Sequence, residues 1–74
     1  MNYTERITSD SNILLGKPVI KGTRISVELI LRKLSEGMQT DELLVAYPQL
    51  KHDDIMAVLS YSAEVVSGEV MIGS

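Results

Sequence analysis

The chain's single histidine stands beside two carboxylates in the run His52-Asp53-Asp54, and these residue types bind metals or carry out acid–base catalysis. Successive residues of a helix point about 100° apart, so three neighbours do not converge on one ion. The chain has no cysteine and no second histidine to complete such a site. We therefore interpret the run as acidic residues at a helix start, and we expect no metal, no cofactor and no enzymatic activity.

A basic turn is the second candidate site. Lys21-Gly22-Thr23-Arg24 lies between two β-rich flanks, and Lys17 precedes it. A glycine turn of this kind can present backbone N–H groups and cations to phosphate, although its spacing is not that of a nucleotide-binding loop. The alternative is a solvated turn in which the glycine serves only the backbone geometry. Lys17, Lys21, Thr23 and Arg24 are therefore candidate nucleic-acid contacts.

The outward face at the start of the third predicted helix is a further candidate interface. Its residues are His52, Asp53, Met56, Ala57, Ser60 and Tyr61. Ser60 and Tyr61 can donate hydrogen bonds to phosphates or bases, whereas a nucleic-acid backbone repels Asp53. The face offers no Arg or Asn for the bidentate contacts that select bases. A solvated face or a dimer contact explains it equally well, so Ser60 and Tyr61 are predicted to be secondary to the basic turn.

The end of the chain carries a short apolar segment. Val70, Met71 and Ile72 follow Gly68 and are too few to form a helix of their own. The segment either packs on the protein's own dimer or binds a partner by strand addition or groove filling. The sequence leaves both alternatives open.

Length, composition and charge restrict the class of protein. Seventy-four residues form one domain (1–74), which without disulfides is marginally stable, so we expect a homodimer. The absence of cysteine and of an apolar run of about 18 residues predicts a cytoplasmic protein with no membrane segment. The net charge is −3, but residues 1–33 hold six cations and three anions, whereas residues 34–74 hold one cation, Lys51, and seven anions. We therefore expect the first half to meet any polyanion.

Residues 1–25 are predicted to form a β element. Tyr3 to Thr8 alternates weakly between two faces and predicts a strand, and Val19 to Ile25 predicts a hairpin that turns at Lys21-Gly22. Such short strands are not stable alone in water, so they must lie on helices or pair with a second subunit. We predict that the dimer is joined through Tyr3–Thr8.

Residues 26–67 are predicted to form three helices, followed by the tail 68–74. Ser26 caps the first, which ends near Gly37, and Thr40 caps the second, which ends before Pro48. The third begins near His52 and is stopped at Gly68. Its inward residues are predicted to be Ile55, Val58, Leu59, Ser62, Ala63 and Val66. The fold class is thus mainly α (α+β), a three-helix bundle with the outline of a helix-turn-helix unit.

One stretch carries a family resemblance. It comprises Arg6-Ile7-Thr8, Ile13 to Ile25, Val27 and Leu31, with Gly37-Met38, Tyr47-Pro48 and Asp54-Ile55 at helix breaks. It resembles domain-of-unknown-function family 433 (DUF433) from Arg6 to about Glu64. The resemblance implies a homeodomain-like or winged-helix fold and a likeness to VapB-type antitoxins, which are encoded beside PIN-like ribonuclease toxins. The chain departs from the family at Leu15, where a second glycine is usual, at Ser26, often proline, and at Lys51, usually a Ser or Thr helix cap.

The resemblance implies an antitoxin-like regulator that binds operator DNA and neutralises a PIN-like ribonuclease toxin. The alternative is a small protein-interaction module that does not bind DNA. In the first case the basic turn contacts DNA and Val70, Met71 and Ile72 contact the toxin; in the second both serve protein contacts only.

Overall fold

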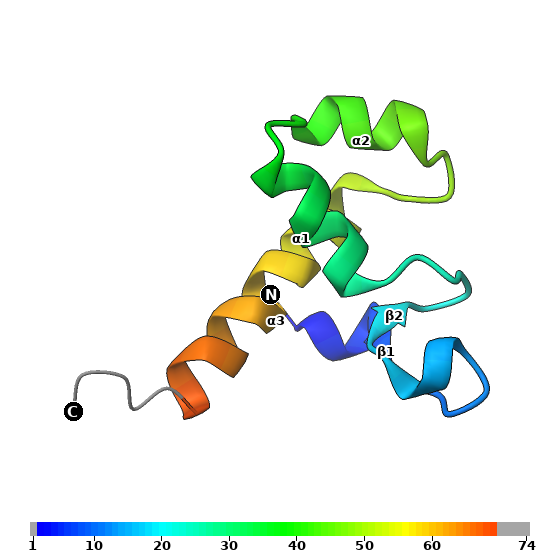
Figure 1. Cartoon of the computed structure of the whole chain (residues 1–74), viewed down its shortest axis with the longest axis vertical. Coiled ribbons are helices and arrows are strands. Elements are labelled where there is room, and N and C mark those ends of the chain that lie inside the picture. Colours follow the sequence, from blue (N-terminus) through cyan, green and yellow to red (C-terminus); the bar gives the residue numbers. More distant parts are fainter. Residues whose placement is uncertain (1, 70–74) are drawn as a thin grey trace.

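The computed structural model describes residues 2–69 and combines three α-helices with a small N-terminal β element (Figure 1). The elements follow the order η1 (Tyr3–Glu5), β1 (Ile7–Thr8), η2 (Leu14–Gly16), β2 (Val19–Ile20), α1 (Val27–Ser35), α2 (Thr40–Ala46) and α3 (His52–Glu69), where η denotes a 3-10 helix. The predicted mixed α+β fold is confirmed at this level. Within the described residues, no helix has both the length and the apolar character needed to cross a membrane.

The predicted strand over Tyr3–Thr8 is wrong in its first half, which forms η1. The Asn2 side chain accepts the backbone N–H of Thr4 at 3.1 Å and so favours a helical turn over an extended strand. The Tyr3 ring then packs edge-on against Tyr61 of α3, with ring centroids 5.3 Å apart. The start of the chain is therefore fixed by contact with α3, and only β1 remains as strand.

The sheet has two short antiparallel strands, and Ile7 of β1 lies opposite Ile20 of β2. After β2 the chain turns at Gly22, whose φ of +78° lies in the left-handed region that glycine adopts at least cost. Ser26 then returns opposite Val19 as a single bridge. The predicted turn is present, but the second strand of the hairpin is reduced to this bridge because Ser26 already begins α1.

The first two helices begin with different caps. The Ser26 hydroxyl accepts a backbone N–H of the first turn of α1 at 2.9 Å, as predicted. In α2 the predicted cap is wrong by one position, since Thr40 is the first helical residue. Gln39 precedes it, and the Gln39 backbone N–H donates to the Glu42 carboxylate at 2.7 Å.

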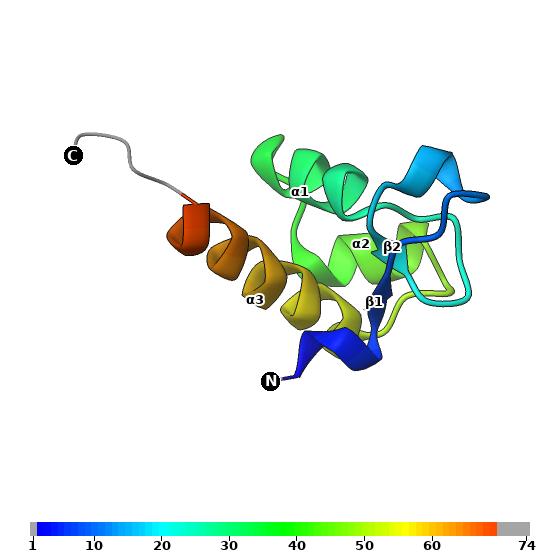
Figure 2. The ribbon, with the colours of Figure 1, turned by 90° about the horizontal axis from the view of Figure 1, so that it is seen from below.

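Helix α3 begins where predicted but continues through Gly68, which costs a helix about 1 kcal/mol without ending it. Ile55 and Val58 are fully buried. Three residues predicted to face inward are exposed instead, namely Leu59, Ala63 and Val66. The other elements cover mainly the first half of α3, and its second half extends beyond them (Figure 2).

The hydrophobic core lies where β2 and the three helices meet. Its largest fully buried side chains are Val19, Ile30, Leu43, Ile55 and Val58. Each helix therefore contributes to the same core, which fixes the position of the turns between them.

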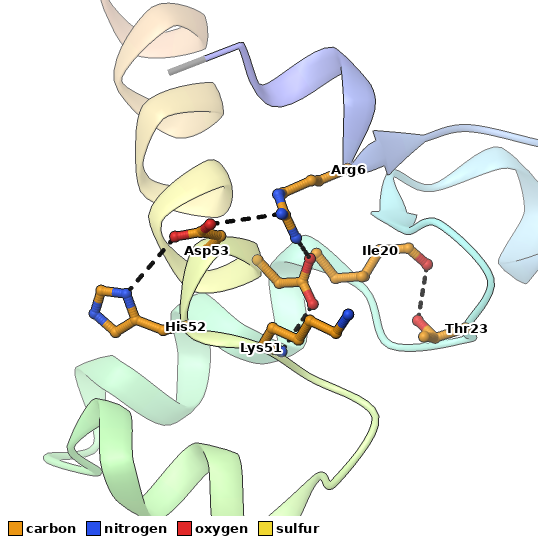
Figure 3. A network of polar contacts seen from close by, with 7 residues as sticks. Arg6, Ile20, Thr23, Lys51, His52 and Asp53 are labelled. Atoms are coloured by element: carbon orange, nitrogen blue, oxygen red, sulfur yellow. Dashed lines mark hydrogen bonds and ion pairs between the residues drawn. The ribbon is translucent and has the colours of Figure 1, made fainter.

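A buried carboxylate connects the N-terminal segment to the start of α3. Asp54, in the first turn of α3, is 6% exposed. Its Oδ1 accepts a hydrogen bond from Arg6 Nη1 at 2.9 Å, and its Oδ2 accepts the backbone N–H of Lys51 at 2.9 Å. Figure 3 shows Arg6 reaching toward the start of α3, where its second nitrogen lies 3.5 Å from the exposed Asp53. Asp54 therefore supplies the N3 half of a capping box, whereas the lysine side chain at position 51 has no acceptor with which to form the other half.

We expect Asp54→Ala to lower the free energy of unfolding by about 2 to 3 kcal/mol, because it removes a charge-assisted hydrogen bond and a helix cap together. Asp53→Ala is the matched control, since its side chain is 59% exposed, and we expect it to cost less than about 1 kcal/mol. Urea unfolding followed by circular dichroism measures both. Equal losses in the two variants would contradict this role for Asp54.

The loop before β2 holds a leucine in an unfavourable conformation. Leu15, at a position where the resembled family usually has glycine, has a φ of +60° and is 95% exposed. The left-handed region costs a side chain about 1 to 2 kcal/mol, and an exposed leucine recovers none of this by packing. The conformation gives a physical reason for glycine at this position.

We expect Leu15→Gly to raise the free energy of unfolding by about 0.5 to 1 kcal/mol, because relief of strain exceeds the added entropy of the unfolded chain. Val45→Gly is the control: Val45 is 81% exposed on α2, and we expect a small loss of up to about 0.5 kcal/mol. Thermal and urea unfolding decide the sign. A loss of stability in Leu15→Gly would show that the loop is not strained.

Candidate nucleic-acid interface

A polar cleft of about 310 Å³ lies between the turn after β2 and the turn that joins α2 to α3. Its lining residues are Glu5, Arg6, Ile20, Lys21, Gln49, Lys51 and Asp54. The two turns lie side by side at the same end of the molecule (Figures 1 and 2). The fold thus brings Lys21 of the basic turn beside Lys51, which comes from the acidic half of the sequence.

Backbone hydrogen bonds fix both turns. The Lys21 N–H donates to the Arg6 carbonyl at 2.8 Å, which ties the basic turn to the first strand. The Leu50 N–H donates to the Tyr47 carbonyl at 2.9 Å and closes the second turn. Lysine side chains on such turns are presented from a rigid backbone, which lowers the entropic cost of binding.

Three exposed cations form what we call the basic edge, namely Lys21, Arg24 and Lys51. Within residues 2–69, none of the three lies within ion-pair distance of a carboxylate. Two carboxylates also line the cleft: Asp54 is already paired with Arg6, whereas Glu5 has no cation within ion-pair distance among the described residues. The Lys51 side chain extends toward Ile20, beside the basic turn (Figure 3). The basic edge therefore has a local excess of positive charge on a protein whose net charge is −3.

Thr23, predicted as a nucleic-acid contact, uses its hydroxyl inside the turn. The hydroxyl donates to the Ile20 carbonyl at 2.8 Å (Figure 3) and accepts the Ile25 N–H at 3.0 Å. Both hydrogen-bonding capacities of the side chain thus hold the backbone. Thr23 shapes the turn that carries Lys21 and Arg24.

Lys17, also predicted as a contact, lies apart from the basic edge. Its Nζ lies 2.9 Å from Glu28 on α1, and Arg32 approaches the other oxygen of the same carboxylate at 2.8 Å. Hydrogen bonds from these two cations lower the pKa of Glu28, with Lys17 the larger influence. Lys17 therefore already has an ion-pair partner within the described chain, which it shares with Arg32.

The predicted outward face of α3 is exposed at His52 and Asp53 but largely covered beyond them. Ala57 is fully buried, and Met56 and Tyr61 pack against the core. Tyr61 also contacts Tyr3, so neither ring is freely presented. Ser60 is half-buried and lies about 14 Å along the helix from Lys51, at about 1.5 Å per residue. Ser60 and Tyr61 thus do not join the basic edge, and α3 contains no Lys or Arg that could.

The histidine region does not converge on a metal. His52 Nδ1 lies 3.9 Å from Asp53, whereas the neighbouring Asp54 points to Arg6. No group of three His, Asp or Glu side chains in residues 2–69 could hold an ion. The predicted partner segment Val70, Met71 and Ile72 lies outside the described residues.

Sequence reasoning missed Lys51 and Gln49 as parts of this interface. Lys51 is the only cation of residues 34–74, and it stands in a predicted turn next to Pro48-Gln49-Leu50. This single positive charge in an acidic half of the sequence was the signal that could have indicated Lys51 as a binding residue. Its proximity to Lys21 could not be inferred, because it depends on how the β element packs on the helices.

Two uncharacterized proteins are similar to this chain in sequence. An uncharacterized protein, y4eO, of Sinorhizobium fredii is 33% identical over 58 residues, which cover 78% of this chain and 26% of that protein. This chain thus spans about a quarter of the length of y4eO. An uncharacterized protein of Archaeoglobus fulgidus is 57% identical over 28 residues, covering 38% of this chain and 78% of the relative.

A solved structure has the same fold. The crystal structure of a DUF433 member protein from Anabaena variabilis superposes with a TM-score of 0.79 at 27% identity, over 90% of this chain and 70% of that one. The family described as "Protein of unknown function (DUF433)" matches residues 7–62, which include the basic edge and the first half of α3. The chain belongs to the DUF433 family.

Proposed function

We propose that this DUF433 chain is an antitoxin-like regulatory protein that binds operator DNA through the basic edge and neutralises a PIN-like ribonuclease toxin. The observation that carries the DNA part is the convergence of Lys21, Arg24 and Lys51 on two adjacent turns. The toxin part is supported by the resemblance to VapB-type antitoxins. The order of α2, a short turn and α3 supports the helix-turn-helix part of the proposal.

The charge distribution sets how a duplex would approach. A phosphate backbone meets unpaired cations at the basic edge, whereas α3 offers carboxylates at Asp53 and Glu64 and no Lys or Arg. The turns therefore make the main contact, and α3 does not enter the groove as the principal reader. Gln49 is exposed in the cleft and can form a bidentate contact with adenine. Affinity per subunit is low, because few phosphates are neutralised.

The rival function, a protein-interaction module without DNA affinity, is favoured by a separate observation. An open apolar groove lies between α1 and α3, and exposed valines line it. Binding experiments can distinguish the two functions, because only DNA binding depends on the cations of the basic edge.

We expect Lys21→Ala with Arg24→Ala to weaken binding to all duplexes and to reduce the slope of log K against log salt by about 2 per subunit, since each phosphate contact contributes about 0.9. Lys51→Ala should weaken binding in the same way. Fluorescence anisotropy at several salt concentrations measures this, with the DNA upstream of the protein's own gene and a scrambled duplex as probes.

Lys33→Ala is the matched control, because it removes one positive charge from the far end of α1, where Lys33 lies 3.9 Å from Glu36. It should leave the salt slope unchanged. Equal weakening by Lys33→Ala would mean that only net charge matters. Loss of binding on Ser60→Ala, with none on Lys21→Ala, would move the interface to α3, and absence of any DNA affinity would favour the rival function.

For the toxin, we expect the triple substitution of Val70, Met71 and Ile72 by serine to abolish protection of cells that express a PIN-like ribonuclease encoded beside this gene. The acidic half of the chain is poorly suited to capture an acidic metal cleft by charge, so apolar contacts must supply the affinity. Val45→Ser, on the exposed face of α2, is the control. Full protection by the triple variant would transfer inhibition to the helical body, and absence of a toxin gene would refute this part of the proposal.

A further inference from the structure

An apolar groove of about 500 Å³ runs between α1 and the second half of α3. Pro18, Val27 and Leu31 line one side, and Tyr61, Val65 and Val66 line the other. Val65 is 39% exposed and Val66 58% exposed. A small protein does not usually leave neighbouring branched side chains on a helix in contact with water, so the surface has the character of an interface.

The groove continues the hydrophobic core. Ile55 and Val58 are fully buried, and Ser62 and Val65 follow them on the same face of α3 at helical spacing. The second half of α3 extends beyond the rest of the domain in both views (Figures 1 and 2). The buried stripe of α3 thus runs on past the point where its own chain covers it.

We propose that the second half of α3 from another copy of this chain occupies the groove, and that the two copies exchange this contact about a twofold axis. Helix α3 is both one wall of the groove and the ridge that projects beyond it. A surface that carries its own ridge and groove satisfies the condition for a twofold dimer, in which the same patch is used by both subunits.

The charges at the rim favour the second half of another copy's α3 as the occupant. On the rim, Glu28 is paired with both Lys17 and Arg32, so this edge of the groove carries one net positive charge. The second half of α3 holds Glu64 and Glu69 and no Lys or Arg. A second copy therefore brings a negatively charged helix to a positively charged edge.

The interface predicted from the sequence, Tyr3–Thr8, is less suited to this role. Tyr3 packs against Tyr61, and Ile7 is 9% exposed within the sheet, so the apolar side chains of that segment already have partners in their own chain. The unfilled apolar surface lies at α1 and α3 instead. Ten residues line the groove, fewer than the 20 to 30 per side of a standard interface, so we expect a weak and reversible dimer.

Sedimentation velocity of the full chain from about 5 to 500 µM tests the dimer, because a weak dimer forms by mass action as the protein concentration rises. We expect a reversible monomer–dimer equilibrium in the parent. Val66→Glu should raise the dissociation constant at least about tenfold, because it places a carboxylate in the apolar groove, where the dimer would bury it without a partner. Val65→Ser should raise it less.

Val45→Glu is the matched control, with the same change on an 81% exposed valine of α2 outside the groove, and it should dimerise like the parent. Circular dichroism at low concentration should give the same helix content for all variants, since each site is exposed. A parent that stays monomeric at the highest concentration overturns the proposal. So does Val66→Glu dimerising as well as the parent, or Val45→Glu weakening the dimer equally.

Discussion

The ion pair between Arg6 and Asp54 is the interaction on which the rest of the structure depends. The carboxylate caps the start of α3 through the Lys51 N–H and at the same time holds the end of η1 against that helix. A buried charge is tolerated here because both of its oxygens are satisfied and a cation lies next to it. The same carboxylate therefore sets where α3 begins and where the β element lies relative to the turn that carries Lys51.

This arrangement separates the molecule into two surfaces of different character. The basic edge is built from turns and presents charge, whereas the groove is built from α1 and α3 and presents apolar side chains. At the rim of the groove Glu28 is shared by two cations, and pairing of Asp54 with Arg6 keeps its negative charge from cancelling the basic edge. The proposed contacts with DNA and with a second copy thus use separate surfaces.

Local signals in the sequence predicted the helices well. The Ser26 cap and the start of α3 were confirmed, because capping and helical periodicity depend on residues within one turn. The strand at Tyr3 was wrong, since the alternation is weak and the ring finds its partner 58 residues later. The exposed side chain of Val66 and the pairing of Lys17 depend on which elements pack together. Local patterns along the chain do not reveal which elements pack together.

The contact between η1 and α3 also bears on the order of events during folding. Tyr3 has its partner at Tyr61, and Arg6 has its partner 48 residues away at Asp54. Closing such a loop is entropically costly, whereas the turns between consecutive helices form locally. Docking of η1 on α3 is therefore a late step of folding, which follows the formation of the local turns and helices.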